Sequence, residues 1–374
     1  MNFDFHGSVP RGVLINYLSR AVSHTSLLDT QEGQTETFED DLRMLKNEGA
    51  KFIGRAAYVW SVVDDKEHFA KCRERAALCH EADPEFILQC CVFECVYKNF
   101  CENTPIPGWV FEAFGQPLEN RCFSMAKMSF PDGRFTDHWG KDTCVPNIMS
   151  LEGQMWIYYR ACMYINCGCE AIHFGQVWLI GALDNNYEMW HKIISKVRGY
   201  AKDHARRGYV ICDAHCHGII TADGRSVFDF NSFPIRLREV AGHDDPGVPQ
   251  KCIAEENYSD SIFGKNKGGA PFLVEFDNFG VSKTPGKFTS DLNNIFAWGY
   301  DEITWFSLQP DGYRSEFLRY INDWVNSRYP DGRVQMPSRR MTTLIGESGE
   351  RKRGLYRANG IDEWVIKEIW QGSR

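Results

Sequence analysis

The chain has 374 residues, of which 43% are hydrophobic and 25% charged, and its formal net charge is −8. This composition excludes a disordered chain, and the acidic balance, with no basic run longer than Arg351-Lys352-Arg353, argues against a nucleic-acid partner. The first residues do not resemble a signal peptide and no apolar stretch is long enough to cross a membrane, so we expect a cytoplasmic protein with no membrane partner.

Segments rich in β-branched and aromatic residues alternate with segments of helical periodicity, which is typical of repeated βα units around a parallel sheet. In chain order, we expect strands at 13–17, 51–58, 86–94, 171–177, 209–213, 234–240, 272–277 and 303–309. The fold class is therefore predicted to be α/β, a (β/α)8 TIM barrel with long βα loops. The whole chain is predicted to be one domain, with a core at about 11–330 and a C-terminal extension, 331–374, that packs on the barrel.

The expected helices carry their own sequence signals. Asp64 or Asp65 is placed to cap a helix whose apolar residues recur at spacings of three and four. Ser150 is placed to cap a second helix, and two more are expected over 187–207 and 313–328. Each of these helices would cover the outside of the barrel between two strands.

Two stretches, 95–149 and 241–270, are longer than the connections usual in a compact domain. The first follows the third expected strand and the second precedes the seventh. Because long ordered loops of such barrels lie mostly at the C-terminal ends of the strands, we expect both on the catalytic face.

Polar side chains lie at or near the C-terminal ends of nearly all the expected strands, where a (β/α)8 barrel has its open concave surface. Burying a polar group at the end of an apolar strand costs free energy unless the group is paired. Polar residues at these strand ends therefore indicate a functional site. The candidate catalytic residues are Glu94, Asp213, Glu275 and Asp277. The candidate substrate-binding residues are Asn16, Arg55, Trp60, Trp109, His173, Gln176, His215, Arg236 and Gln309.

The four acids end strongly apolar strands, and arginines such as Arg55 and Arg236 are expected near them. An arginine can hold one carboxylate charged, while an apolar pocket keeps a second carboxyl protonated. Glycoside hydrolysis requires this pair of states. Aromatic rings in the loops, Trp60 and Trp109 among them, suit stacking against the faces of a sugar.

The acid that ends the seventh strand and the tryptophan of Trp305-Phe306-Ser307 resemble features of the large clan of (β/α)8-barrel glycoside hydrolases, clan A. The resemblance covers about residues 11–330 as architecture. It implies a nucleophilic glutamate on the seventh strand, which Glu275 or Asp277 matches, and an acid/base glutamate after the fourth. Here the fourth strand ends in His173-Phe174-Gly175-Gln176, without a carboxylate, so Glu94 or Asp213 would supply the acid.

Two other functions stay open. Asp213-Ala214-His215-Cys216-His217 resembles the metal-binding motif of amidohydrolase barrels, which would make the protein a metal-dependent hydrolase. A barrel can also bind sugar without catalysis. The fourteen cysteines lack the paired spacing of a zinc site and are expected to be reduced core or incidental residues.

The sequence thus favours a glycoside hydrolase that acts on an intracellular oligosaccharide or glycoside through paired carboxylates. Its partner is expected to be a small carbohydrate, and neither a cofactor nor a metal is assigned. Whether the chain forms a homo-oligomer is left open.

Overall fold

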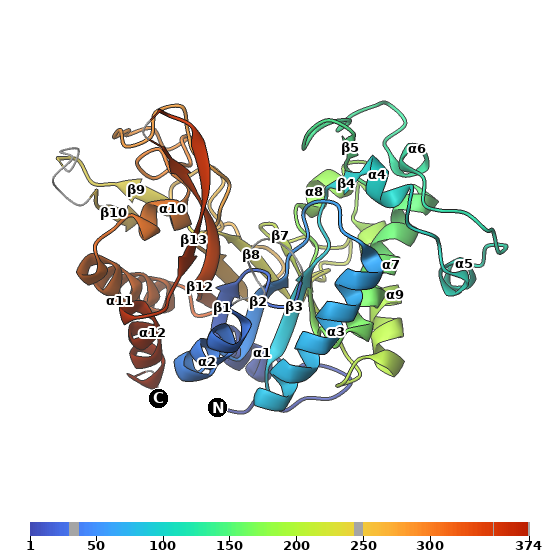
Figure 1. The fold of residues 1–374 in the computed structure, drawn as a ribbon, viewed down its shortest axis with the longest axis horizontal. Coiled ribbons are helices and arrows are strands. Elements are labelled where there is room, and N and C mark those ends of the chain that lie inside the picture. Colours follow the sequence, from blue (N-terminus) through green and yellow to red (C-terminus); the bar gives the residue numbers. More distant parts are fainter. Residues whose placement is uncertain (30–36, 243–249, 347, 373–374) are drawn as a thin grey trace.

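The computed structural model describes residues 1–29, 37–242, 250–346 and 348–372 (Figure 1). Eight parallel strands form a closed ring in the order of the sequence. They are β1 (Ala21–His24), β2 (Phe52–Ala57), β3 (Ile87–Cys91), β6 (Ala171–His173), β7 (Ile211–His215), β8 (Phe230–Pro234), β11 (Phe272–Glu275) and β12 (Gly332–Ile345). Pairing of β12 with β1, with Val22 opposite Met336, closes the ring. The predicted (β/α)8 barrel is confirmed.

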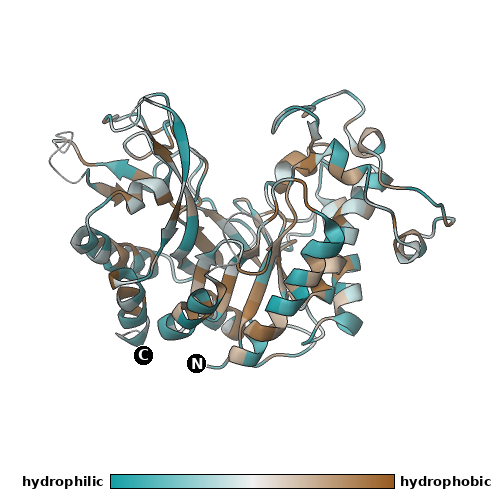
Figure 2. Cartoon of the chain, viewed as in Figure 1, coloured by the Kyte–Doolittle hydropathy of each residue, from teal (hydrophilic) through white to brown (hydrophobic). Residues whose placement is uncertain are grey.

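Helices cover the outside of the ring, with their polar faces turned to solvent (Figure 2). The long ones are α2 (Phe38–Glu48), α3 (Asp65–Ala82), α7 (Leu151–Asn166), α9 (Glu188–His204), α11 (Asp311–Arg328) and α12 (Ile361–Gly372). The Asp64 side chain accepts a hydrogen bond from the Glu67 N–H, and that of Ser150 accepts one from the Gly153 N–H, so both predicted caps are present.

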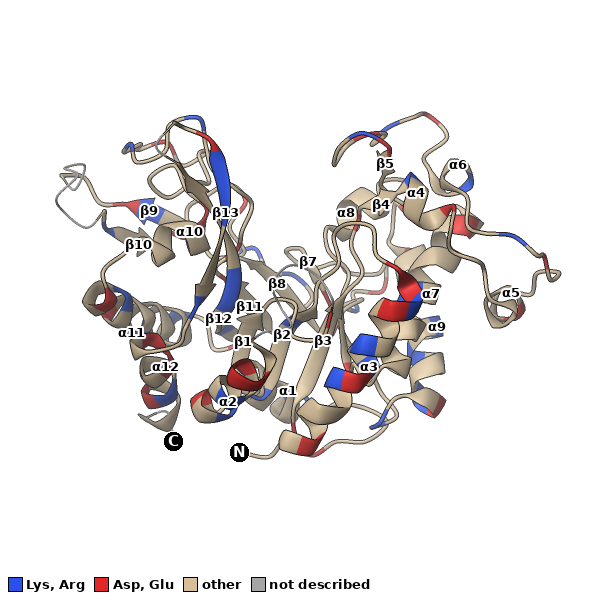
Figure 3. Cartoon of the chain, viewed as in Figure 1, with Lys and Arg blue, Asp and Glu red and all other residues tan. Residues whose placement is uncertain are grey.

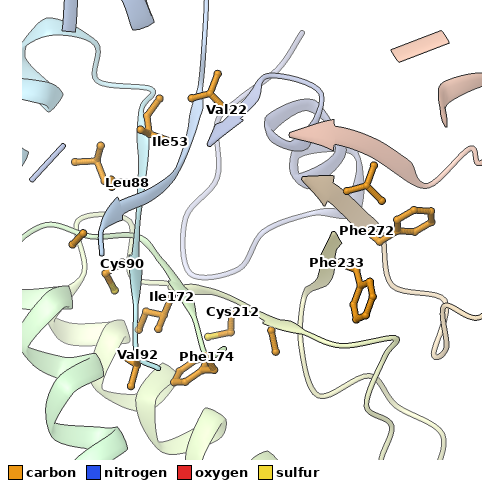
Figure 4. Packing of buried hydrophobic residues seen from close by; sticks show 14 of the residues in the cluster. Val22, Ile53, Leu88, Cys90, Val92, Ile172, Phe174, Cys212, Phe233 and Phe272 are labelled. Atoms are coloured by element: carbon orange, nitrogen blue, oxygen red, sulfur yellow. The ribbon is translucent and has the colours of Figure 1, made fainter. Parts of the chain in front are cut away.

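Apolar side chains fill the space between the strands and the helices. Val22, Ile53, Leu88 and Ile172 come from four neighbouring strands and belong to one buried cluster (Figure 4). Burial of such a cluster is the main favourable contribution to folding. It fixes the strands and, with them, the residues at their ends.

The N-terminal end of the barrel is closed by α1 (Arg11–Leu18), whose Tyr17 and Leu18 pack with the first residues of the strands, among them Phe52 and Ile87. A strand at 13–17 was the expectation, and it is wrong. The buried residues of α1 recur at helical spacing and Pro10 precedes its first turn, so the apolar run is one face of a helix.

The segment at 303–309, expected to be the eighth strand, is a helix, α10 (Glu302–Ser307). The Asp301 side chain accepts from the Thr304 N–H at 2.8 Å and caps it. The eighth strand is β12, which pairs with β11 and β1. The expected core of 11–330 therefore ends too early, since the supposed extension supplies a barrel strand.

The sixth barrel strand also differs from the expected 234–240. It is β8, which ends at Pro234, and the chain then forms β9 (Leu237–Glu239), paired antiparallel with β10 (Cys252–Ala254). Buried apolar residues continue from Phe233 of β8 through Ile235 to Leu237 of β9, so hydrophobicity does not mark the boundary between the two strands.

Two lobes stand above the C-terminal ends of the strands (Figure 1). The first, within 95–149, contains β4 (Val96–Tyr97), α4 (Lys98–Cys101), α5 (Gly108–Ala113), α6 (Met125–Met128) and β5 (Thr143–Cys144). With α7, it has its own apolar cluster. The second contains α10, the β9–β10 pair and the upper part of β12, which pairs antiparallel with β13 (Arg351–Arg357). A short helix, α8 (Val177–Ile180), follows β6. Within the described ranges, no helix is both long and apolar enough to cross a membrane.

Candidate active site

A cleft of about 1120 Å³ opens at the C-terminal ends of the barrel strands, and residues of both lobes line it. Eight of the sequence-predicted residues line this cleft: Arg55, Trp60, Glu94, His173, Gln176, His215, Arg236 and Asp277. Residues of the two long stretches, 95–149 and 241–270, thus border the cleft. This is expected, because the parallel strands of a barrel all end at one rim.

Five predicted residues do not line the cleft. Asp213 and Glu275 lie buried at its strand ends, 1% and 0% exposed, where other side chains enclose them. Asn16 lies on α1, at the opposite end of the barrel, and its amide donates to the Asn2 carbonyl. Trp109 stacks on Tyr200 of α9, a contact on the outer side of the first lobe.

Gln309 is the fifth of these residues. It is 5% exposed, and its amide donates to the Trp305 carbonyl at 2.9 Å, one turn earlier. Its predicted role depended on an eighth strand at 303–309. Because that segment is a helix, the end of the eighth strand is elsewhere, and the prediction of a binding residue at this position has lost its basis.

Asp277 follows β11 and reaches the cleft. Its carboxylate accepts a hydrogen bond from Arg340 of β12 at 2.7 Å and one from the Asn278 N–H at 2.8 Å. Burial alone would raise the pKa of Asp277, but Arg340, Arg55 and His215 outweigh it and lower the pKa to about 2. Asp277 is therefore a charged carboxylate across the ordinary pH range.

Glu94 lies in the loop after β3, 2% exposed. Its two carboxylate oxygens accept from the backbone N–H and the side-chain amide of Gln176, at 3.0 and 2.9 Å. Burial nevertheless raises the pKa of Glu94, against the lowering effect of these amides and of His173. This carboxyl keeps its proton to a higher pH than an ordinary glutamate does.

Asp213 holds His173 in place at the floor of the cleft. Its carboxylate accepts from Gln89 at 2.7 Å and from the Ser232 hydroxyl at 2.8 Å, and it lies 2.8 Å from Nδ1 of His173. A carboxylate on one ring nitrogen fixes the orientation of an imidazole and its tautomer. Asp213 thus orients His173, which is the group that lines the cleft.

Glu275 is paired with Arg55. The Arg55 guanidinium donates to both oxygens of Glu275, and Arg340 lies 3.7 Å from the same carboxylate. Arg55 has a φ of 64°, in the left-handed region, at a position where the pairing of β2 with β3 shifts register. A residue other than glycine keeps this strained conformation only where contacts with the surrounding structure stabilise it. We interpret Glu275 as the counter-ion that keeps Arg55 at the cleft floor.

The metal-binding alternative depends on His215 and His217. Nε2 of His217 lies 2.6 Å from the Asp260 carbonyl, and the Asp213 carboxylate is engaged with His173. Burial lowers the pKa of His215 to about 4, so its imidazole is neutral near pH 7. Over the described ranges, no group of three or more histidine, cysteine or acidic side chains is arranged as a set of metal ligands.

Aromatic side chains form much of the cleft wall. Trp60 packs edge-on against Phe93, with ring centroids 4.8 Å apart, and against Trp139 of the first lobe at 5.3 Å. Trp178, also at the cleft, is 52% exposed. Flat apolar rings with polar neighbours are the usual surface for sugars.

Sequence reasoning missed three residues of this site. Arg340 fell in the supposed extension, although its strand brings it to Asp277. Gly175 has a φ of 61°, and a Cβ at this position would collide with the Glu94 carboxylate, so only glycine lets Glu94 lie there. Asp260 binds Arg236 through both oxygens, at 3.1 and 2.7 Å, but lies in a loop without a pattern that predicts it.

Comparisons with known proteins give distant likenesses. No protein-family model and no curated protein matches the chain. Among solved structures, a GH2 β-galacturonidase from Eisenbergiella tayi bound to galacturonate is 13% identical, over 94% of this chain and 50% of that one, with a TM-score of 0.43. The glycoside hydrolase domain of PelA from Pseudomonas aeruginosa is 8% identical, over 79% of this chain and 90% of that one, with a TM-score of 0.36.

A debranching enzyme from Nostoc punctiforme is 12% identical, over 58% of this chain and 52% of that one, with a TM-score of 0.36. The matched part of the chain spans about half the length of that enzyme. These likenesses assign no residue of the cleft. The predicted barrel architecture is confirmed by the strand pairing itself.

Proposed function

We propose that the chain is a glycoside hydrolase, with Glu94 as the general acid and Asp277 as the nucleophile or the base. The observation that carries this proposal is that one cleft holds two carboxyls with different partners, Asp277 with Arg340 and Glu94 with the Gln176 amides. Burial raises the pKa of Glu94, while Arg340 and Arg55 outweigh burial and lower the pKa of Asp277. One protonated and one charged carboxyl are what the hydrolysis of a glycosidic bond needs.

In the proposed reaction, Glu94 gives its proton to the glycosidic oxygen as the bond to the anomeric carbon breaks. Asp277 either attacks that carbon or takes a proton from the water that does. The positive charge that develops on the sugar ring would be stabilised by the Asp277 carboxylate. His173, oriented by Asp213, and Gln176, bound to Glu94, would position sugar hydroxyls and the acid.

The size of the cleft supports an oligosaccharide or a glycoside with a sizeable aglycone. Its volume, about 1120 Å³, slightly exceeds the range of about 300–1,000 Å³ usual for small-molecule sites. Trp60, Trp139 and Trp178 would stack on successive sugar rings. A cytoplasmic location, with a substrate that has been imported, remains part of the proposal.

The test is hydrolysis of a panel of 4-nitrophenyl glycosides by the wild type and by Asp277→Asn. We expect turnover of at least one glycoside, and a loss of kcat/KM of about 10³-fold in the variant, as for other essential acid–base groups. Asp223→Asn is the matched control, because Asp223 is exposed and pairs with Arg225 outside the cleft. Full activity of Asp277→Asn would contradict the proposal. Saturable sugar binding without any product would favour the non-catalytic alternative.

A further inference from the structure

One face of the β12–β13 ribbon borders the cleft. Thr343 of β12 lies directly opposite Arg353 of β13, and Ile345 opposite Arg351. Opposite residues of an antiparallel pair, and alternate residues of one strand, share a face. Thr343, Arg351 and Arg353 accordingly all line the cleft, and Figure 3 shows the basic stretch of β13 on the lobe beside the barrel mouth.

Lys352, between these two arginines, lies on the opposite face of the strand. It does not line the cleft, and its amino group pairs with Glu350 at 2.8 Å. The same short run of basic residues therefore places two side chains toward the cleft and one away from it. This difference provides an internal control for any effect of charge.

Lys267 brings a further cation to the cleft from the loop between β10 and β11. The loop is held in place, because the Lys267 N–H donates to the His217 carbonyl at 2.8 Å and its backbone contacts Gly218 so closely that a Cβ there would collide. Lys267 itself is exposed. Its position at the cleft is thus fixed by backbone contacts, while its side chain is accessible to a ligand.

The acids Asp277 and Asp260 of the cleft are paired with cations other than Lys267 and Arg351. Asp277 is paired with Arg340 and Asp260 with Arg236, each at 2.7 Å. No carboxylate of the described part of the chain forms an ion pair with Lys267 or Arg351, and Arg351 donates instead to the neutral carbonyl of Val281 at 3.1 Å. Within the described ranges, Lys267 and Arg351 thus bring positive charge to the cleft without an ion-pair partner, in a chain of net charge −8.

We propose that the cleft recognises a glycan that carries an anionic group, a carboxylate or a sulfate ester, bound by Arg351 and Lys267. The inference rests on the proposed glycosidase function, whose substrate class it names. A guanidinium matches the planar geometry of a carboxylate and the oxygen pairs of a sulfate, and an ammonium attracts either as a point charge. Cations that border a cleft also concentrate an anionic ligand there before it binds.

Binding is measured by titration calorimetry. The Glu94→Gln variant, which lacks the proposed general acid, is used so that the measurement does not depend on hydrolysis. The probes are matched pairs: oligogalacturonates beside their methyl esters, glucuronate-containing oligosaccharides beside their methyl esters, and sulfated galactan oligosaccharides beside the desulfated chains. We expect an acidic member of a pair to bind at least about tenfold more tightly than its neutral partner, with a difference that shrinks as salt is raised. The pair that shows it identifies the carboxylate or the sulfate as the group recognised.

In the same background, Arg351→Gln and Lys267→Gln should each weaken binding of the acidic member about 3- to 5-fold, as expected for one partly exposed ion pair. Binding of the neutral member should not change. Lys352→Gln, which removes the same charge on the other face of β13, should leave both unchanged.

Three outcomes would overturn the inference: no acidic probe binds, the neutral members bind as tightly as the acidic ones, or Lys352→Gln weakens binding as much as Arg351→Gln. Failure of the proposed function gives a different result. In that case the acidic probes bind with the expected dependence on Arg351 and Lys267, but the wild type releases no product from them.

Discussion

Arg340 donates a hydrogen bond to the Asp277 carboxylate at 2.7 Å, across the pairing of the last two barrel strands. Together with Arg55, this contact outweighs burial and makes Asp277 a stronger acid than an ordinary aspartate. Glu94, in the same cleft, has amides but no arginine as hydrogen-bond partner, and burial makes it a weaker acid. The difference in partners shifts the pKa values of the two carboxyls in opposite directions.

The first prediction concerns Glu94→Gln and the leaving group. Glutamine cannot donate the proton that a poor leaving group needs, whereas a 4-nitrophenolate leaves without help. We expect kcat/KM to fall about 10²- to 10⁴-fold for the natural glycosidic linkage and much less for the nitrophenyl glycoside. Comparing the two substrates checks this. An equal loss on both would argue that Glu94 has a structural role.

The second prediction is the pH dependence of kcat/KM. The proposed mechanism needs Asp277 charged and Glu94 protonated. Because the pKa of Asp277 is lowered to about 2 and that of Glu94 is raised, activity should stay high through mildly acidic pH and fall as pH rises through the pKa of Glu94. The pH profile of Glu94→Gln, measured on the nitrophenyl glycoside, should lack this alkaline decline. An alkaline decline that persists in the variant would assign it to another group.

How far the sequence could predict the fold is clearest at the strands. β2, β3, β6 and β11 are mostly apolar and lie within predicted segments. β1 and β12 were missed because half of the residues in each are polar. His24 of β1, for example, faces Ser338 of β12, with Nδ1 3.1 Å from the hydroxyl. Hydrophobic periodicity does not detect a strand whose burial depends on polar partners from a distant part of the chain.

The candidate site shows the same limit. The prediction from the strand ends placed Glu94 and Asp277 at one rim, where both line the cleft, because parallel strands of a barrel all end there. They could not separate these two acids from Asp213 and Glu275, which are equally near the rim but enclosed. That distinction comes from His173 and Arg55, whose contacts with the enclosed acids only the three-dimensional structure gives.

The third prediction separates a structural from a catalytic role for Glu275. Glu275→Gln leaves Arg55 without its main counter-ion in a buried site, which typically costs about 3–5 kcal/mol. We expect the free energy of unfolding, measured in denaturant, to drop by about this amount. The folded variant should keep kcat within about tenfold of the wild type, since this carboxylate does not line the cleft. A loss of kcat as large as that of Asp277→Asn, at unchanged stability, would return Glu275 to the list of catalytic residues.

The fourth prediction is a loss of stability in acid that depends on His68 of α3. This side chain is fully buried, its Nε2 lies 2.9 Å from the Tyr164 hydroxyl, and burial, with Arg160, lowers its pKa to about 3. In the unfolded chain an ordinary histidine takes up a proton near pH 6.5. Between about pH 6.5 and pH 3 the unfolded chain therefore binds a proton that the folded chain does not, and the folded state loses about 1.4 kcal/mol per pH unit from this group.

In His68→Gln this contribution is absent, so the free energy of unfolding should vary with pH less steeply than in the wild type over that window. Denaturant titrations at a series of pH values measure both slopes. His6→Gln is the control, because His6 is exposed near the N-terminus, and it should keep the wild-type slope. If His68→Gln and the wild type lose stability in parallel between pH 6.5 and 4, the buried imidazole is not the group that takes up the proton on unfolding, and the acid sensitivity must come from elsewhere in the core.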